Sequence, residues 1–332
     1  MKSSRKLPLL VLLALSVSAV GQKQVTDFLE MGKDAAGIMT KEYLRPYGEM
    51  LGKSLNGGWY NSASIHKLGG FDLTVGVNMV MAPPSAESFD VAGLINTLPG
   101  NWSLEDPSVS KAPTAAGSMT ERPVLVNDDL EQRVELPNGS GYNVFPMPIA
   151  QVSVGLPGHT EVSARFVPKM SVGNAGKVNL YGFGLTHSFK EYVPILKRFP
   201  IWQASVMAAY THFGSEVDVD SYVDVDVDSY EGGTDQSLEI DANGFTGRFL
   251  LGIKVPVLEL YTGVGYGSTT SDFALKGNYG PLGSNPIALA YKEKGLDFNA
   301  GLKLQLGFLA LYGDYTFGDY SMLSAGLGIS FR

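Results

Sequence analysis

The chain has 332 residues, of which 44% are hydrophobic and only 17% are charged, against about 25% charged residues in soluble domains. Its formal net charge is −8, which makes nucleic acid a poor candidate partner, because phosphate binding needs clustered Lys and Arg. The absence of cysteine excludes disulfides, thiol catalysis and thiolate metal sites. After residue 21, no apolar run approaches the roughly 20 residues that a membrane helix needs.

The first residues have the organisation of a secretory signal peptide. Three basic residues lie among the first six, residues 7–20 are mostly apolar, and small residues precede Gln22. A signal peptidase recognises this order of charge, apolar run and small residues. We therefore predict a cleaved signal peptide over residues 1–21. The alternative is a lone N-terminal anchor helix, for which the apolar run is short.

Residues 22–70 are predicted to form a helical segment. From Val25 to Leu55, apolar side chains recur at intervals of three and four, the spacing of one helix face. Pro46 is expected to break or restart the helix, and the run Asn56-Gly57-Gly58 to end it. Because this segment precedes the first strand, we expect it in the periplasm or folded into a barrel as a plug.

From Phe71 onward, the spacing of the apolar residues changes to two. In residues 296–306, Leu, Phe and Ala alternate with Asp, Asn, Gly, Lys and Gln, and residues 320–331 repeat the pattern. About 11 residues with one apolar and one polar edge is the length of a tilted strand that crosses a bilayer. The alternative is a soluble β-sandwich, in which a second sheet covers the apolar edge.

The lengths of the connections favour the barrel, since transmembrane barrels have short periplasmic turns and long outer loops. Tight inner turns are expected at residues 157–158, 255–257 and 307–308, and a short helical or kinked connection over 190–200. Long outer loops are expected at 82–147, 214–241 and 272–293.

The predicted fold class is an all-β, transmembrane antiparallel β-barrel over residues 71–332, with the N-terminal helical plug-like segment before it. Ten strands can be assigned from the alternation. Residues 82–147 contain several prolines, but 65 residues without structure are unusual in a compact domain. We expect two to four further strands there, and therefore 12–14 strands in total.

An acidic segment contains a ladder of carboxylates. Asp224, Asp226 and Asp228 alternate with Val and Ser, so in an extended chain their side chains point to one face, roughly 6–7 Å apart. A divalent cation such as Ca²⁺ would relieve their repulsion, which makes these three residues candidate metal ligands. The alternative is a solvated extension of a strand, because the turn glycines of a calcium loop are missing.

No residue pattern indicates catalysis. The four histidines have no metal-binding spacing, and no nucleophile-elbow motif is present. We predict no enzyme activity, no catalytic residue and no cofactor. The glycine-rich run Gly263–Gly267 lies within a predicted strand, where small side chains on the inner face leave room for something inside the barrel.

Several blocks resemble a family of uncharacterised exported outer-membrane β-barrel proteins common in Bacteroidota. These blocks are Tyr43–Gly48, Leu55–Asn61, His66–Thr74 and Gly184–Lys190. The resemblance covers most of the mature chain and implies a barrel, but no catalytic residue, because the family has no settled activity. A helical segment before a large barrel is also distantly similar, in layout, to long-chain fatty-acid transporters, whose N-terminus plugs the lumen.

These features predict a protein of the Gram-negative outer membrane, exported by its signal peptide and inserted by the barrel-assembly machinery. The leading hypothesis is a plugged channel for uptake or binding of a small hydrophobic ligand. Its gate would lie within residues 23–70, with Trp59, Tyr60, His66 and Lys67 as contacts. The alternative is a non-transporting barrel that anchors a protein partner of a surface or secretion assembly. Outer-membrane lipid is a partner in both.

Overall fold

The computed structural model describes residues 27–171, 176–218, 235–279 and 283–331. Within these residues, ten long strands are present. They are β1 (Phe71–Met81), β7 (Val144–Leu156), β8 (Thr160–Ser171), β9 (Lys177–Ser188), β10 (Trp202–Asp218), β11 (Ser237–Lys254), β12 (Leu258–Lys276), β13 (Ala288–Leu306), β14 (Leu309–Phe317) and β15 (Ser321–Phe331).

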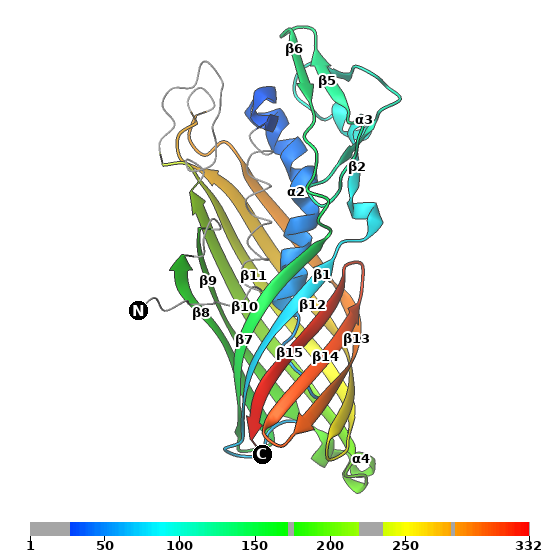
Figure 1. The fold of residues 1–332 in the computed structure, drawn as a ribbon, viewed down its shortest axis with the longest axis vertical. Helices are drawn as coiled ribbons and strands as arrows, with labels where there is room; N and C mark the ends of the chain where they lie inside the picture. Colours follow the sequence, from blue (N-terminus) through cyan, green and yellow to red (C-terminus); the bar gives the residue numbers. More distant parts are fainter. Residues whose placement is uncertain (1–26, 172–175, 219–234, 280–282, 332) are drawn as a thin grey trace, which may run out of the picture.

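The ten strands close into one antiparallel barrel (Figure 1). Strands β7 to β15 each pair with the next strand in the chain, and β1 closes the barrel by pairing with both β15 and β7. The predicted all-β antiparallel barrel is therefore confirmed, and its strands are the ten that the alternation of apolar residues assigns.

The prediction of two to four further barrel strands within residues 82–147 was wrong. In the described residues, the segment 82–143, which we call the insertion, forms two small sheets apart from the barrel. Strands of three or four residues span at most about 13 Å, whereas the hydrocarbon layer is about 30 Å thick. The elements of the insertion are η2 (Pro84–Ala86), β2 (Ser88–Asp90), α3 (Val91–Ile95), β3 (Trp102–Leu104), β4 (Lys111–Pro113), β5 (Val124–Asn127) and β6 (Gln132–Glu135).

The N-terminal helix lies inside the barrel. A short turn η1 (Phe28–Met31) precedes α2 (Lys33–Asn56), which contacts β12, β13 and β11 on one side and β1, β10 and β7 on the others. Figure 1 shows α2 descending into the lumen from the end of the barrel that carries the insertion. The predicted N-terminal helix is thus confirmed and lies inside the barrel, whereas residues 57–70 of the predicted helical segment lead without helix down to β1.

The interruption predicted at Pro46 was wrong, because α2 continues through this buried residue. A proline inside a helix removes one hydrogen bond and costs about 3 kcal/mol. The barrel wall contacts α2 from several sides, and this packing holds the helix together where the isolated sequence would bend or stop.

The outer surface of the barrel carries a band of apolar side chains, which we call the apolar belt. On four neighbouring strands, this band ends at an aromatic residue or a leucine, and a polar residue follows two positions further along the outer face. The last apolar residues are Tyr210, Phe245, Tyr266 and Leu296, and the polar residues that follow are His212, Asn243, Ser268 and Lys294. Large exposed apolar surfaces of this extent indicate contact with lipid, and the aromatic edge is typical of the membrane interface.

Four strands continue well beyond the belt, so two outer loops are shorter than predicted. Strand β10 runs to Asp218 and β11 begins at Ser237, while β12 runs to Lys276 and β13 begins at Ala288. The loops predicted at 214–241 and 272–293 are therefore partly strand. The outer faces of these extensions are polar, so apolar alternation could not reveal them.

The connection between β9 and β10 contains η4 (Lys190–Tyr192) and α4 (Pro194–Arg198), which confirms the short helical connection predicted over 190–200. It lies at the opposite end of the barrel from the insertion (Figure 1). The same end carries the tight turns that link β7 to β8, β11 to β12 and β13 to β14. Among the described helices, none is both long and apolar enough to span a membrane.

If lipid covers the apolar belt, Leu302→Arg should destabilise the barrel strongly. Leu302 is exposed near the middle of the belt on β13, where an outward-facing Arg costs about 2–4 kcal/mol. Ala290→Arg is the matched control, because Ala290 lies on the same outer face beyond the belt. Urea titration of folding into lipid vesicles measures both changes, and equal losses for the two variants would contradict the belt.

Candidate functional site in the barrel lumen

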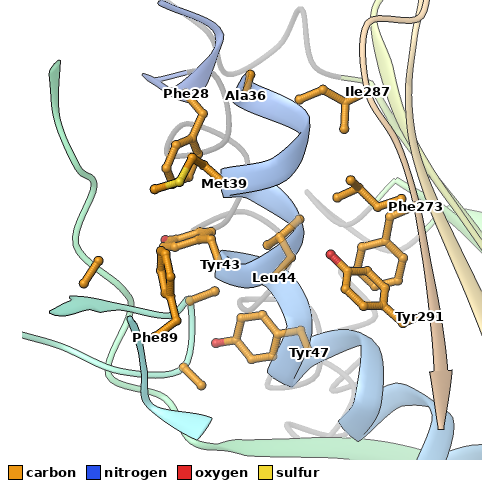
Figure 2. Packing of buried hydrophobic residues seen from close by; sticks show 14 of the residues in the cluster. Phe28, Ala36, Met39, Tyr43, Leu44, Tyr47, Phe89, Phe273, Ile287 and Tyr291 are labelled. Atoms are coloured by element: carbon orange, nitrogen blue, oxygen red, sulfur yellow. The ribbon is translucent and has the colours of Figure 1, made fainter. Parts of the chain in front are cut away.

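The first half of α2 is held between the insertion and the barrel wall by aromatic side chains (Figure 2). On the insertion side, Tyr43 lies near Phe89, and its hydroxyl donates to the Asn138 carbonyl oxygen at 3.0 Å. On the wall side, Tyr291 of β13 stacks edge-on against Phe273 of β12, with ring centroids 5.3 Å apart. The upper part of the plug is therefore mainly an apolar contact.

Glycines on both surfaces bring the helix and the wall close together. A Cβ atom on Gly48 of α2 would lie 2.5 Å from ring atoms of Tyr291, and one on Gly267 of β12 would lie 2.7 Å from Nδ2 of Asn56. Gly263 of β12 likewise faces the lumen, where its Cβ would meet the Tyr60 hydroxyl at 2.6 Å. The small inward-facing residues predicted within Gly263–Gly267 therefore make room for the plug.

The lower half of α2 is joined to the wall by a buried ion network. Lys53 of the plug donates to Oδ2 of Asp297 on β13 at 2.6 Å, and Arg248 of β11 donates to the same oxygen at 3.0 Å and to the second carboxylate oxygen. All three side chains are less than 9% exposed. One carboxylate thus binds a cation of the wall and a cation of the plug.

Trp59 lies shortly after the helix, against the adjacent wall strands β8 and β9. The Arg165 guanidinium of β8 stacks over its ring at 3.9 Å. Cβ atoms on Gly182, which pairs with Arg165, and on Gly184 of β9 would lie 2.9 Å and 3.0 Å from the indole. The wall therefore contains a slot shaped for this one side chain.

Tyr60 crosses the lumen toward the opposite wall. Its hydroxyl donates to Oδ1 of Asn299 on β13 at 2.6 Å, and its ring meets Tyr261 of β12 edge-on, with centroids 6.0 Å apart. Tyr261 in turn donates to Asp314 at 3.2 Å. Trp59 and Tyr60 together tie the plug to strands on two sides of the barrel.

Glu259 of β12 anchors the segment that follows. Its carboxylate accepts hydrogen bonds from the backbone N–H of Ala63 at 2.8 Å and of Ser64 at 3.1 Å. The hydroxyls of Ser62 and Ser64 also donate to it, at 2.8 Å and 3.0 Å. A carboxylate with four such donors can be buried without a large penalty, because each donor replaces a water molecule.

His66 and Lys67 differ in their surroundings. Nδ1 of His66 lies 2.7 Å from Glu161 of β8, and Nε2 lies 3.0 Å from the Ser330 hydroxyl of β15. The side chain of Lys67 is exposed. Of the four residues predicted to form the gate, Trp59, Tyr60 and His66 therefore contact the wall, whereas Lys67 faces outward at the lower end.

Sequence reasoning missed the wall residues that these plug residues contact. Arg165, Arg248, Glu259 and Asp297 each occupy an inward-facing position on a strand whose outward-facing neighbours are apolar. A charged residue on the polar edge of an otherwise apolar strand is the signal that would have indicated them, because burying it requires a partner.

A small cavity of about 10 Å³ lies between the end of α2 and the wall, lined by Leu55, Met147, Ile149 and Leu180 among others. This is room for about one water molecule.

The predicted cation ligands Asp224, Asp226 and Asp228 lie outside the described residues. In the part of the chain that the structure describes, no cluster of His, Cys, Asp or Glu is arranged to hold a metal ion.

The closed barrel, its apolar belt and its internal helix define a barrel of the outer-membrane type. The chain belongs to the family described as "Family of unknown function (DUF6588)", whose pattern matches residues 1–331. No curated protein matches the sequence.

Among solved structures, the chain is similar to the outer-membrane protease OmpT of Escherichia coli, with 8% identity, a TM-score of 0.33 and coverage of 81% of this chain and 100% of that one. The translocator domain of the autotransporter NalP from Neisseria meningitidis matches with 12% identity, a TM-score of 0.33 and coverage of 80% and 89%. The attachment protein Ail of Yersinia pestis matches with 9% identity, a TM-score of 0.29 and coverage of 80% and 99%. Identities and scores this low transfer no activity to this chain, and the absence of enzyme activity stays a prediction.

Removing the shared carboxylate of the ion network should cost far more than removing the plug's cation. Asp297→Ala leaves Lys53 and Arg248 buried without an anion, which costs about 3–5 kcal/mol. Lys53→Met keeps the pair between Arg248 and Asp297 and should cost clearly less. Chemical unfolding of the two variants in detergent micelles measures the difference, and equal costs would show that the network does not carry the contact.

The Glu259 anchor is tested by hydrogen exchange at the backbone amide of Ala63. Glu259→Ala removes its acceptor, so its exchange should rise about tenfold or more, since a hydrogen bond to a charged group contributes about 1.5–3 kcal/mol. The amide of Ser64 also donates to the Ser62 hydroxyl at 2.9 Å, so its exchange should rise less. Glu259→Gln keeps an acceptor oxygen and should have a smaller effect. Exchange that is unchanged in Glu259→Ala would mean that residues 62–64 are held by other contacts.

Proposed function

We propose that this protein is an outer-membrane channel whose N-terminal segment, residues 27–70, is a movable plug that admits a small apolar molecule. In this proposal the end with the tight turns faces the periplasm, and the end with the insertion faces outward, as the lengths of barrel connections favour. Export by a cleaved signal peptide over residues 1–21 and insertion by the barrel-assembly machinery remain predictions, as does the likeness in layout to long-chain fatty-acid transporters.

One observation carries the proposal: the barrel wall is built around a separate segment instead of filling its own lumen. Inward-facing glycines such as Gly263 and Gly267 leave space that α2 and Tyr60 occupy. A barrel that served only as a scaffold would fill its interior with side chains of its own strands, as small barrels do.

The chemistry of the contact also supports movement of the plug. Lys53, Tyr60 and the segment at Ser62 contact the wall through ion pairs and hydrogen bonds. Water can replace such contacts when the plug shifts, whereas an apolar interface would lose its full burial energy. The aromatic contacts of the first half of α2 would act as the fixed end.

A second candidate function is a non-transporting barrel that presents the insertion to a protein partner. The observation that favours it is the tie between the insertion and the plug: the backbone N–H of Ala115 donates to the Tyr43 carbonyl oxygen at 2.8 Å, and Tyr43 donates to Asn138. Such a barrel would stay closed, and a stoichiometric protein would co-purify with it from solubilised outer membrane.

A disulfide between plug and wall separates the two functions. The Cβ of a residue at 267 would lie 3.5 Å from the Cβ of Asn56, within the range of about 3.5–4.5 Å found in disulfides. In this cysteine-free chain, Asn56→Cys/Gly267→Cys should therefore lock the plug. Under oxidation, cells that carry this variant should take up the apolar fluorophore N-phenyl-1-naphthylamine only at background rate, and a reductant should restore uptake.

The matched control is Thr262→Cys/Ala300→Cys, a directly opposed pair of β12 and β13 on the outer face. Its disulfide joins two wall strands without touching the plug, so uptake should not change. Uptake that is the same in the oxidised and reduced states of the plug-locked variant would sink the channel and favour the partner-binding barrel.

A further inference from the structure

Two neighbouring strands of the barrel separate in their upper halves. Strand β7 pairs with β1 along residues 144–154, but with β8 only along 151–156. Strand β8 pairs with β9 up to Ser171, but with β7 only along 160–165. Figure 1 shows the two strands together at the lower end and apart above it. We call the gap between residues 144–150 and 166–171 the seam.

The sequence of β7 removes the donors that would close the seam. Gly155 donates its N–H to the Gly70 carbonyl oxygen at 2.9 Å, in register with the pairing of β7 and β1. Because N–H groups alternate along a strand, odd-numbered residues of β7 turn theirs toward β1 and even-numbered residues toward β8. Pro146 and Pro148 occupy two of these even positions and have no N–H.

Strand β8 also lacks a backbone donor on the edge that faces β7. Ser188 of β9 donates to the His159 carbonyl oxygen at 2.9 Å, so odd-numbered positions of β8 face β9 and even-numbered ones face β7. Pro168 is an even position inside the seam. It also lies where the register of β8 and β9 shifts, between Val167 and Met170.

The prolines face each other across the gap. Continuing the register of the last paired residues upward places Ala150 opposite Phe166 and Pro148 opposite Pro168. Of these four residues, the two prolines lack an N–H, and Pro146 lacks the next one on β7. Prolines in sheets are confined to edges and bulges, so the opening is a property of the sequence.

On the neighbouring strand β9, the apolar belt ends at the level where the seam begins, since its outer face changes from Phe183 and Tyr181 to Asn179, and Tyr181 pairs with Phe166 of β8. On β7 and β8 the outer faces stay apolar along the seam, as far as Val144 and Met170. Phe166, at the lower corner of the seam, is 67% exposed. An amphiphile in the membrane would have its headgroup at this level and its chain below it.

Behind the seam lies a cation that lacks an anion. Arg165 is 3% exposed, and its Nε and Nη2 donate to Gln151 Oε1 and the Gly57 carbonyl oxygen. Among the described residues no carboxylate lies within ion-pair distance, in contrast to Lys53 and Arg248. Nε1 of Trp59, in the ring beneath the guanidinium, is buried and has no acceptor.

The small cavity beside Leu55 connects these features. Its lining includes Pro148 and Ile149 of β7, Arg165 of β8 and Leu180 of β9, so apolar side chains and the guanidinium meet directly inside the seam. Two donor-only groups without a negative partner match an anionic oxygen, and the apolar lining matches a hydrocarbon chain.

We propose that the seam is a lateral portal through which a single-chain anionic amphiphile passes between the membrane and the lumen, with its headgroup bound by Arg165. This names the substrate class and route of the channel proposed above and rests on that function. Passage requires the end of α2 at Leu55 to move, because the cavity of about 10 Å³ does not hold an acyl chain.

The test uses Trp59 as a reporter in the full chain, with Trp102 and Trp202 changed to Phe. The probe is 6-bromoundecanoate, whose mid-chain bromine stays near the Trp59 indole and quenches it when Arg165 binds the carboxylate, added to lipid vesicles that contain the protein. Ile149→Cys/Val167→Cys places one thiol on each side of the seam, and a short bifunctional thiosulfonate bridges them. Bridging should remove most of the quenching of Trp59, and a reductant should restore it.

The matched control is Ser153→Cys/Ser163→Cys, bridged in the same way. These residues belong to the same two strands below the seam, where their hydroxyl oxygens lie 2.8 Å apart, so bridging them should leave quenching unchanged. Quenching that survives the bridge at 149 and 167 would overturn the portal.

The headgroup is tested with 6-bromoundecan-1-ol, which has the same chain without the charge. At equal concentration in the membrane it should bind about tenfold more weakly, because it loses the charge-assisted hydrogen bonds to Arg165. Equal quenching by acid and alcohol would overturn the assignment of Arg165.

Together, the seam bridge and the disulfide at residues 56 and 267 also distinguish failure of the portal from failure of the proposed channel. If the seam bridge leaves quenching intact while the disulfide at 56 and 267 still abolishes uptake, the portal fails and the channel stands. If that disulfide leaves uptake unchanged, the movable plug fails, and the portal fails with it, because passage requires the end of α2 to move.

Discussion

Hydrocarbon supplies no hydrogen-bond partner to a backbone, and the architecture of this protein follows from that constraint. Each barrel strand has a neighbour on both sides over most of the apolar belt, and β1 completes the circle by pairing with β7 and β15. Unpaired edges begin near the upper margin of the belt. Strand β13 continues beyond its pairing with β14 at Phe298, and β7 and β8 separate at the level of Phe166. There, water and headgroups can satisfy the free backbone groups.

Inside the wall, a different constraint applies, because the lumen must be filled. Around the upper half of the plug, aromatic side chains such as Tyr43 and Tyr291 pack into the lumen. Around the lower half, the lumen holds charged side chains such as Lys53 and Asp297 together with their hydrogen-bonding partners. These two halves respond differently to water. Apolar packing resists separation, whereas paired charges and hydroxyls exchange partners readily, so the lower end of the plug is the part suited to movement.

The sequence predicts this fold where a single physical cause dominates. Ten strands were recognisable because one of their faces meets lipid and the other does not. The insertion was misjudged because its short strands are surrounded by prolines and carry no such alternation. In the site, Trp59, Tyr60 and His66 were found because they lie between the helix stop and the first strand. Arg165 and Glu259 were missed because one sequence does not show which polar residue meets the plug, and Tyr261 because inward- and outward-facing aromatics look alike.

The strand that closes the barrel is covalently continuous with the plug. Residues 57–70 lead directly into β1, whose partner β15 is the last strand of the chain. The helix and the wall therefore share one backbone at the place where the sheet closes, so the strand that seals the circle is also the strand that tethers its contents. Without β15, β1 would lack one of its two neighbours, and the wall around α2 would stay open on that side.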